Sequence, residues 1–174
     1  LGTVCDVVEL KKYNRLFVKK GLELIQKRYH RGISKLIDNS KINSTPTSQD
    51  LGYIVGPQIN AASRSDDSAL ASKLLISNDI EQIDLISKKL FLLNEKRKLI
   101  ENQILDNAKE QASNQLNSKI IIVYGSNWHQ GVLGIIASKL TEIYYKPAIV
   151  ISFTNNIGVG SARSIDNIDL GKII

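Results

Sequence analysis

The chain has 174 residues, of which 43% are hydrophobic, so it can form one medium or two small globular domains and is too apolar to be disordered. No apolar run reaches the roughly 20 residues that span a bilayer, and no charged-then-apolar leader opens the chain, so we expect no membrane segment and no signal peptide. The single cysteine excludes an internal disulfide and fits a reducing compartment, so we expect a cytoplasmic protein. The formal net charge of +6 favours an acidic partner such as nucleic acid, although a lysine-rich proteome would give the same balance.

The first part of the chain, residues 1–77, predicts a strand and several short helices. Residues 1–10 read as a strand followed by a turn. Apolar spacing predicts three short helices, over residues 14–26, 33–37 and 69–75. Ser48 is the expected cap of a further helix, which Gly56-Pro57 should kink or break.

The longest predicted element is a helix from Asp79 to about Asn114, capped by Asn78 and free of glycine and proline. Its apolar residues form one stripe with a single break at Arg97. Such a helix suits a coiled coil or a bridge between two domains. Different, compact patterns lie on both sides of it, so we expect a bridge.

Residues 118–174 predict a small α/β domain. The expected order is a strand over 120–124, a helix over 131–145, a strand over 148–153, a turn at Asn155-Asn156 and a strand over 158–164. This β-α-β-β order is typical of an α/β sheet that gathers its ligand-binding loops at one end. The predicted fold class is therefore α/β, in three parts: 1–77, 78–117 and 118–174. Methionine is absent, even at position 1, so we expect an internal piece of a longer protein.

Two segments of the last part suggest a phosphate site, residues 127–138 (NWHQGVLGIIAS) and residues 158–164 (GVGSARS). A helix starting near Gly131 would present free N–H groups to an anion, and Arg163 can grip a phosphate with its planar fork. We expect the two segments to form two walls of one site. His129 suits stacking on a base and capping of the helix equally well.

Three other features have a functional and an ordinary explanation. Asn60 and Arg64 lie four residues apart, so a helix would place them on one face, but a packed helix with an exposed arginine explains them equally well. Asp66-Asp67 suits a cation site or, more often, a helix cap. Asp6 suits a hard divalent cation, although one carboxylate cannot make a two-metal site.

Together these segments resemble the RecJ family of DHH phosphoesterases. Residues 1–10 (LGTVCDVVEL) resemble the last catalytic motif of that superfamily, and residues 56–64 (GPQINAASR) resemble the RecJ motif that follows it. The two C-terminal segments resemble the two motifs of the DHH-associated domain. The four motifs occur in the family's order and span nearly the whole chain.

The resemblance implies a 5′-to-3′ exonuclease that degrades single-stranded DNA in repair and recombination, with Mn²⁺ or Mg²⁺ as cofactor. It implies that residues 1–77 end the DHH catalytic domain, that 78–117 form the connector helix, and that 118–174 form a truncated DHH-associated domain. The family's other metal ligands, including the Asp-His-His triplet, would precede this segment. The implied partners are single-stranded DNA and a single-strand-binding protein or helicase, with no membrane, and the chain is expected to be monomeric.

The resemblance also assigns residues to roles. Asp6 matches a metal ligand, and Asp6 and His129 are the expected catalytic residues. The DNA-binding residues that it implies are Asn60, Arg64, His129, Gln130, Gly160, Ser161, Arg163 and Ser164. Gln58 stands where the family usually has a basic residue, and Ser63 stands where it usually has a glycine. Because glutamine carries no charge, we expect the phosphate contact at Arg64 and not at Gln58.

Three alternatives remain open at this point. A DHH phosphodiesterase of short oligonucleotides or cyclic dinucleotides would share the motifs. A non-catalytic nucleic-acid-binding remnant would lack the remaining metal ligands. A plain coiled-coil interaction protein would explain the long helix and none of the four motifs.

Overall fold

The computed structural model describes residues 1–42, 44–64 and 69–173, with the side chain of Arg64 excepted. The chain divides into two compact units, residues 1–96 and 97–174, each with its own core. The division falls inside the longest helix, where Arg97 interrupts the apolar stripe. No helix in the described ranges is both long and apolar enough to cross a membrane.

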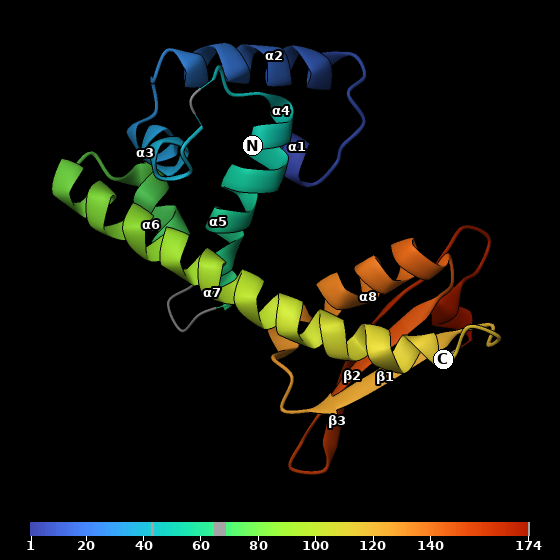
Figure 1. Ribbon diagram of the computed structural model, residues 1–174. Helices are drawn as coiled ribbons and strands as arrows, with labels where there is room; N and C mark the ends of the chain where they lie inside the picture. Colours follow the sequence, from blue (N-terminus) through green and yellow to red (C-terminus); the bar gives the residue numbers. More distant parts are fainter. Residues whose placement is uncertain (43, 65–68, 174) are drawn as a thin grey trace. The chain divides into compact units, whose positions relative to one another are not determined.

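The first unit is helical (Figure 1). Its elements are α1 (Gly2–Cys5), α2 (Tyr13–Gln26), α3 (Arg31–Asn39), α4 (Ser48–Asp50), η1 (Leu51–Val55), α5 (Gly56–Ala61), η2 (Ala62–Arg64), α6 (Leu70–Ile76) and the first part of α7 (Ile80–Ser113). The three short helices predicted from apolar spacing are confirmed as α2, α3 and α6. Leu36 and Ile37 of α3 are fully buried in this core, together with Leu74 of α6 and Leu90 of α7.

The N-terminal segment is a short helix, so the strand predicted over residues 1–10 is wrong. The amides of Val4 and Cys5 both donate to the carbonyl of Leu1, at 2.9 and 3.0 Å. A strand needs a neighbouring strand for its backbone groups, and the described residues of this unit contain none. Local helical bonds satisfy those groups instead, and Leu1 and Val4 pack against the core.

Two predicted helix caps are off by one residue. Thr47, rather than Ser48, caps α4: its hydroxyl accepts from the Asp50 amide, and the Asp50 carboxylate accepts from the Thr47 amide at 2.8 Å. Asp79, rather than Asn78, caps α7 and accepts from two first-turn amides at 2.9 and 3.3 Å. In both helices the capping oxygen belongs to the residue whose side chain reaches the first free amides.

At Gly56-Pro57, where a kink or a break is predicted, the helix continues through an irregular turn. The turn before it widens into the π-helical segment η1, in which the Gly56 amide bonds to the carbonyl of Leu51. Pro57 then lies in the first turn of α5, where a backbone N–H is not needed for a helical hydrogen bond.

The long helix is confirmed as α7, which ends at Ser113. It contributes buried side chains to the core of each unit. Those in the first unit are Ile83, Ile86 and Leu90, and those in the second unit are Ile104, Leu105, Ala108 and Ala112.

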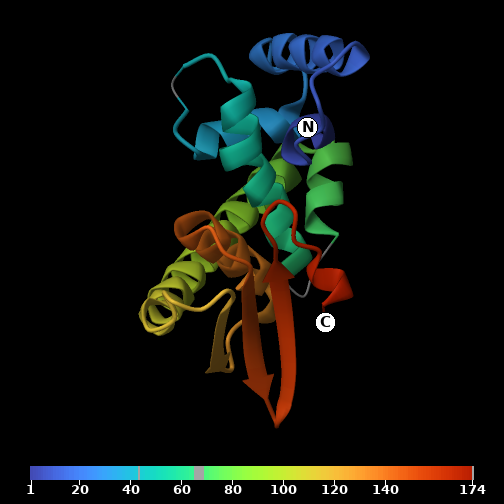
Figure 2. The same ribbon diagram turned by 90° about the vertical axis from the view of Figure 1, so that its right-hand side faces the viewer.

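The second unit is an α/β domain in the predicted β-α-β-β order. Its elements are β1 (Ile121–Ser126), α8 (Gln130–Tyr144), β2 (Ala148–Thr154), β3 (Ile157–Arg163) and the short η3 (Leu170–Lys172). The sheet has the order β1-β2-β3, with β1 and β2 parallel and β2 and β3 antiparallel (Figure 2). Asn155 and Asn156 both have positive φ, 50° and 64°, as a two-residue type I′ hairpin turn requires. The last part of α7 and α8 pack on the face that carries Ile121, Val123 and Val150.

The outer edge of β1 is bonded to two glutamine side chains, Gln111 of α7 and Gln115 of the turn that follows it. The carboxamide of Gln115 accepts from the Ile122 amide at 3.0 Å and donates to its carbonyl at 2.8 Å. Gln111 makes the same pair of bonds to Tyr124, at 3.0 and 2.7 Å. Each carboxamide bonds to both backbone groups of one residue of β1, as a neighbouring strand would, so the two side chains substitute for a strand. They cover an edge that would otherwise be open to pairing.

Candidate nucleic-acid interface

The strongest candidate site lies along the seam between β3 and α8. The Nε of Arg163 donates to the hydroxyl of Ser138 at 3.0 Å, and that hydroxyl donates to the carbonyl of Gly134 at 3.1 Å. A Cβ at Gly134 would lie 3.2 Å from the Ser161 hydroxyl, so glycine lets the strand approach the helix closely. Thr141 donates to the carbonyl of Arg163 at 3.4 Å and fixes the end of β3.

This arrangement orients the guanidinium and leaves its outer edge available. The terminal nitrogens of Arg163 and the hydroxyl of Ser161 have no partner in the described part of the chain. Arg163 is exposed, so its two remaining donor groups can bind two oxygens of one phosphate. Ser161 and Arg163 are predicted from the sequence, whereas Ser138 is not. Its position four residues after Gly134, on the same face of a helix, is the signal that could have indicated it.

Two other predicted residues of this segment have local structural roles. The Ser164 hydroxyl donates to the carbonyl of Ile168 at 2.6 Å, so its proton is committed within the chain. A Cβ at Gly160 would lie 3.1 Å from the carbonyl of Val150, so close packing against β2 explains the glycine. A DNA contact by either residue stays a prediction.

His129 caps α8, and this changes the expected anion site at the helix start. Its Nδ1 accepts from the Gly131 amide at 3.1 Å, and its carbonyl accepts from the Val132 amide at 3.1 Å. The expectation of a free N–H group at Gly131 is therefore wrong, because this amide already donates a hydrogen bond to the imidazole of the cap residue. Gln130 is exposed and has no side-chain bond among the described residues, so its DNA contact stays a prediction, as does a catalytic role for His129.

The two C-terminal segments meet along the seam, where Gly134 and Ser138 of the first lie beside Ser161 and Arg163 of the second, but the loop before α8 lies away from Arg163. Arg163 pairs with Ala148 at the start of β2, whereas the 127–130 loop follows the end of β1, where Ser126 pairs with Phe153. Five strand positions at roughly 3.3 Å each separate these two ends, about 17 Å in all. The expectation that the start of α8 faces the same anion as Arg163 is wrong, whereas a phosphate site between the two segments stays a prediction, with α8 and β3 as its two walls.

Asp6 lies just after α1 and is exposed. Its carboxylate has the oxygen chemistry that Mg²⁺ and Mn²⁺ prefer, so it fits as one metal ligand. The described residues contain no group of three or more His, Cys, Asp or Glu side chains placed to hold a metal. Partial burial raises the pKa of the adjacent Cys5 thiol, which donates to the carbonyl of Leu51 at 3.7 Å and is not poised as a thiolate ligand.

The predicted pair of Asn60 and Arg64 is described only in part. Asn60 is exposed at the end of α5, and its side-chain oxygen accepts from the Ser63 hydroxyl at 3.0 Å. The helix narrows to the 3-10 form at η2, which changes the four-residue spacing on which the shared face depended. The side chain of Arg64 and the Asp66-Asp67 pair lie outside the described residues, so their roles stay predictions.

Gln58 points into the core of the first unit. It is 1% exposed, and its side-chain nitrogen donates to the hydroxyl of Ser40 at 2.7 Å and to the carbonyl of Ile54 at 3.1 Å. Burial excludes a phosphate contact by this residue.

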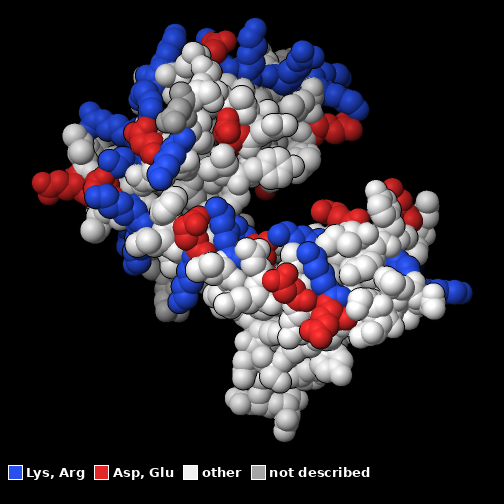
Figure 3. All heavy atoms as spheres, viewed as in Figure 1, with Lys and Arg blue, Asp and Glu red and all other residues white. Residues whose placement is uncertain are grey.

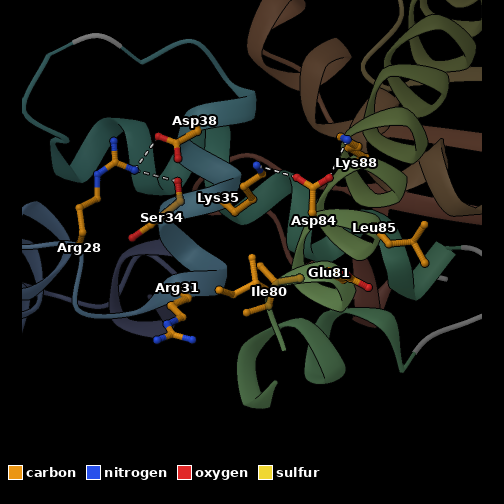
Figure 4. A pocket seen from close by; sticks show the side chains of 11 residues that line it. Arg28, Arg31, Ser34, Lys35, Asp38, Ile80, Glu81, Asp84, Leu85 and Lys88 are labelled. Carbon is orange, nitrogen blue, oxygen red and sulfur yellow. Dashed lines mark hydrogen bonds and ion pairs between the residues drawn. The ribbon is translucent and has the colours of Figure 1, made fainter. Parts of the chain in front are cut away.

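A separate hollow of about 770 Å³ lies between α3 and α7 in the first unit (Figure 4). Three of its cations pair with carboxylates: Lys35 and Lys88 each contact Asp84 at 2.6 Å, and Arg28 contacts Asp38 at 2.6 Å. The hydrogen bonds from Lys35 and Lys88 hold the pKa of Asp84 below its usual value. Since these cations are already paired, the hollow is a weaker candidate for DNA than the seam.

Residues 99–174, which include nearly all of the second unit, match the DHHA1 domain. Over its whole length the chain is a homologue of the RecJ exonucleases. It is 35% identical to the single-stranded-DNA-specific exonuclease RecJ of Haemophilus influenzae and 33% identical to that of Bacillus subtilis, covering 100% and 98% of this chain. The chain spans 32% and 22% of the length of these two relatives.

Solved RecJ structures share the fold. The Mg²⁺ complex from Thermus thermophilus superposes with a TM-score of 0.87 at 29% identity, over 98% of this chain and 26% of that one. An exonuclease RecJ bound to manganese superposes with a TM-score of 0.83 at 28% identity, over 98% of this chain and 42% of that one.

Proposed function

We propose that this chain is the strand-end-binding part of a RecJ-type exonuclease, which degrades single-stranded DNA from the 5′ end in bacterial DNA repair and recombination. The protein acts as a monomer in the cytoplasm, with a single-strand-binding protein or a helicase as its partner. Homology over the whole chain supports the proposal. The observation that carries it is the exposed Arg163 guanidinium, held by Ser138 at 3.0 Å with its terminal nitrogens unpaired among the described residues.

Arg163 and Ser161 bind the terminal phosphate of the strand. The two outer nitrogens of the guanidinium donate to two phosphate oxygens, and the Ser161 hydroxyl donates to a third acceptor. Because Ser138 fixes the plane of the guanidinium before DNA arrives, less side-chain freedom is lost on binding. Holding the strand end in this way sets the distance from the end to the bond that is cut.

Asp6 provides one carboxylate to the metal site, and further ligands come from sequence outside the described residues. When bound, Mn²⁺ or Mg²⁺ activates water and stabilises the leaving oxygen. The 174-residue chain alone should therefore bind single-stranded DNA weakly and digest it negligibly in Mn²⁺. Robust digestion by the purified chain would contradict the proposal that most of the metal ligands come from other sequence.

A chimera tests the proposed function directly. This chain replaces the matched segment of the Haemophilus influenzae relative, a segment of about a third of that protein. We expect the chimera to degrade 5′-phosphorylated single strands with Mn²⁺, and Asp6→Asn to abolish the reaction. A folded, Mn²⁺-binding chimera with no nuclease activity, or full activity in the Asp6→Asn variant, would contradict the proposal. A length series of substrates separates this activity from hydrolysis of short oligonucleotides alone.

A further inference from the structure

We propose that the positively charged surface formed by α2 and the start of α3 binds the sugar-phosphate backbone of single-stranded DNA, as a site separate from the one on β3 and α8. We call it the α2–α3 basic surface; its residues are Lys12, Arg15, Lys19, Lys27, Tyr29 and Arg31. The proposal goes beyond the proposed function, because backbone binding on this surface needs neither a terminal phosphate nor a metal.

The positive charge of the chain is concentrated in one short segment. Of the 23 lysines and arginines, ten lie in residues 11–41, together with two of the 17 acidic residues, which gives this segment a formal charge of +8. The rest of the chain keeps 13 basic and 15 acidic residues, a formal charge of −2. A lysine-rich proteome would raise the basic content everywhere, so it does not explain the separation. Lysine and arginine side chains gather over α2 (Figure 3), and such a concentrated field favours a polyanionic partner.

The cations of α2 do not stabilise the helix on which they lie. Lys12 is the N-cap and Arg15 lies in the first turn, where the helix dipole favours acidic side chains and none is present. Arg15 and Lys19 are four residues apart, so two like charges repel on one side of the helix. None of these three residues, nor Lys27, forms an ion pair with a described carboxylate. Helix stability therefore does not account for these cations, whereas the regularly spaced charges of a phosphate backbone do.

Between α2 and α3 an aromatic side chain lies among the cations. Tyr29 is 80% exposed and lines a hollow of about 280 Å³ that also contains Arg31, Ser77 and Asn78. The guanidinium of Arg31 donates one of its five N–H groups to the carbonyl of Asn78 at 3.1 Å, which orients the group and leaves further donors for a phosphate. An exposed ring beside an oriented guanidinium can stack on an unpaired base. Since the bases of a duplex already stack on one another, this feature favours a single strand.

Two triple variants with equal loss of charge test the surface. The first replaces three of its cations: Lys19→Gln, Lys27→Gln and Arg31→Gln. The matched control replaces three exposed cations elsewhere: Lys73→Gln, Lys96→Gln and Lys119→Gln. Fluorescence anisotropy measures the affinity of the 174-residue chain for an oligothymidylate with a 5′ hydroxyl at several salt concentrations. Each phosphate contact of a single strand adds about 0.7 to the slope of log affinity against log salt, so the first variant should lower the slope by about 2 and weaken binding about tenfold or more at low salt. The control should leave the slope unchanged and the affinity within about twofold.

Tyr29→Ala tests the stacking separately from the charge. We expect affinity for the same oligothymidylate to fall about fivefold or more with the salt slope unchanged, because the ring contacts a base and no phosphate. Tyr53→Ala is the matched control, since its ring is 83% exposed on η1. Equal affinities of the two variants would remove Tyr29 from the surface.

Equal weakening by the two triple variants, or an unchanged salt slope in the first, would overturn the proposal. It would also fail if the chain bound phosphatidylglycerol vesicles and the first variant lost that binding while keeping its affinity for the strand, because the partner would then be a membrane. Should the first variant unfold, Lys19→Gln alone must lower the slope by about 0.7, and an unchanged slope would have the same consequence. The first variant should weaken binding of strands with a 5′ phosphate and a 5′ hydroxyl by the same factor. A parent chain with no preference between these two strands would contradict only the strand-end site.

Discussion

A neutral hydroxyl orients Arg163, so none of the positive charge of the guanidinium is cancelled at the seam. Ser138→Ala should leave the charge in place and remove only the bond to Nε. Since one hydrogen bond is worth about 1 kcal/mol, we expect binding of 5′-phosphorylated single strands to weaken about fivefold, measured by fluorescence anisotropy. Ser34→Ala is the matched control, because its hydroxyl also donates to the carbonyl four residues earlier but lies on α3. Equal weakening in both variants would remove Ser138 from the site.

Glu101 is a second residue whose role the sequence does not reveal. It is 5% exposed and binds Arg97 and Lys139, each at 2.6 Å. Glu101→Gln should lower the free energy of unfolding by about 2 kcal/mol, less than the roughly 3–5 kcal/mol of a fully buried pair because Lys139 still reaches water. Urea denaturation measures the loss, and exposed Glu110→Gln should stay within about 0.5 kcal/mol of the parent. Equal stability of the two variants would contradict this role.

At the scale of elements, Gln111 of α7 and Gln115 of the turn after it cover the open edge of β1. Gln111→Met keeps the side-chain length and removes both bonds to Tyr124. We expect faster hydrogen exchange at the Tyr124 amide, measured by NMR, and little change at Ile122, which Gln115 still holds. Exposed Gln103→Met should leave both amides unchanged. Unaltered exchange at Tyr124 would show that its amide does not depend on Gln111.

Side-chain caps start α3, α4, α7 and α8, and both histidines serve as caps, at α3 and α8. The cap of α4 also has a pH dependence. The Thr47 amide, and then its hydroxyl, hold the pKa of Asp50 below its usual value. This cap therefore stabilises the fold above the unfolded pKa of about 3.9 and loses its effect as the pH falls through the lower folded pKa. In Thr47→Ala, an NMR titration should show the pKa of Asp50 rising part of the way toward its usual value, because the amide bond remains. An unchanged pKa would exclude the Thr47 hydroxyl as a cause of the shift.

Elements defined by local periodicity were predictable, and elements defined by distant partners were not. The stripe of α7, the apolar face of α8 and the Asn155-Asn156 turn all follow from spacing within one segment. The N-terminal run has β-branched residues but no strand beside it, so it folds as α1. The same reasoning explains the site: Arg163 is visible in a motif, whereas its bond to Ser138 joins residues 25 positions apart.

At the scale of the whole molecule, the proposed strand-end site and the one proposed metal ligand lie in different units. The seam of the second unit is complete within residues 97–174, because every side chain that orients Arg163 comes from α8. The metal site is incomplete within the described residues, which agrees with a chain that spans about a third of its Haemophilus influenzae relative. Binding of a strand end can thus be measured on this chain without catalysis.

The most direct measurement compares the affinity of the 174-residue chain for one single strand with a 5′ phosphate and with a 5′ hydroxyl. We predict tighter binding of the phosphorylated strand, and loss of most of that preference in Arg163→Lys, which keeps the charge but cannot bind two oxygens in a fork. The melting temperature of the variant should match that of the parent, because the outer edge of the side chain is exposed. Equal affinity for the two strands, or a preference that survives Arg163→Lys, would contradict the assignment of the β3–α8 seam as the strand-end site.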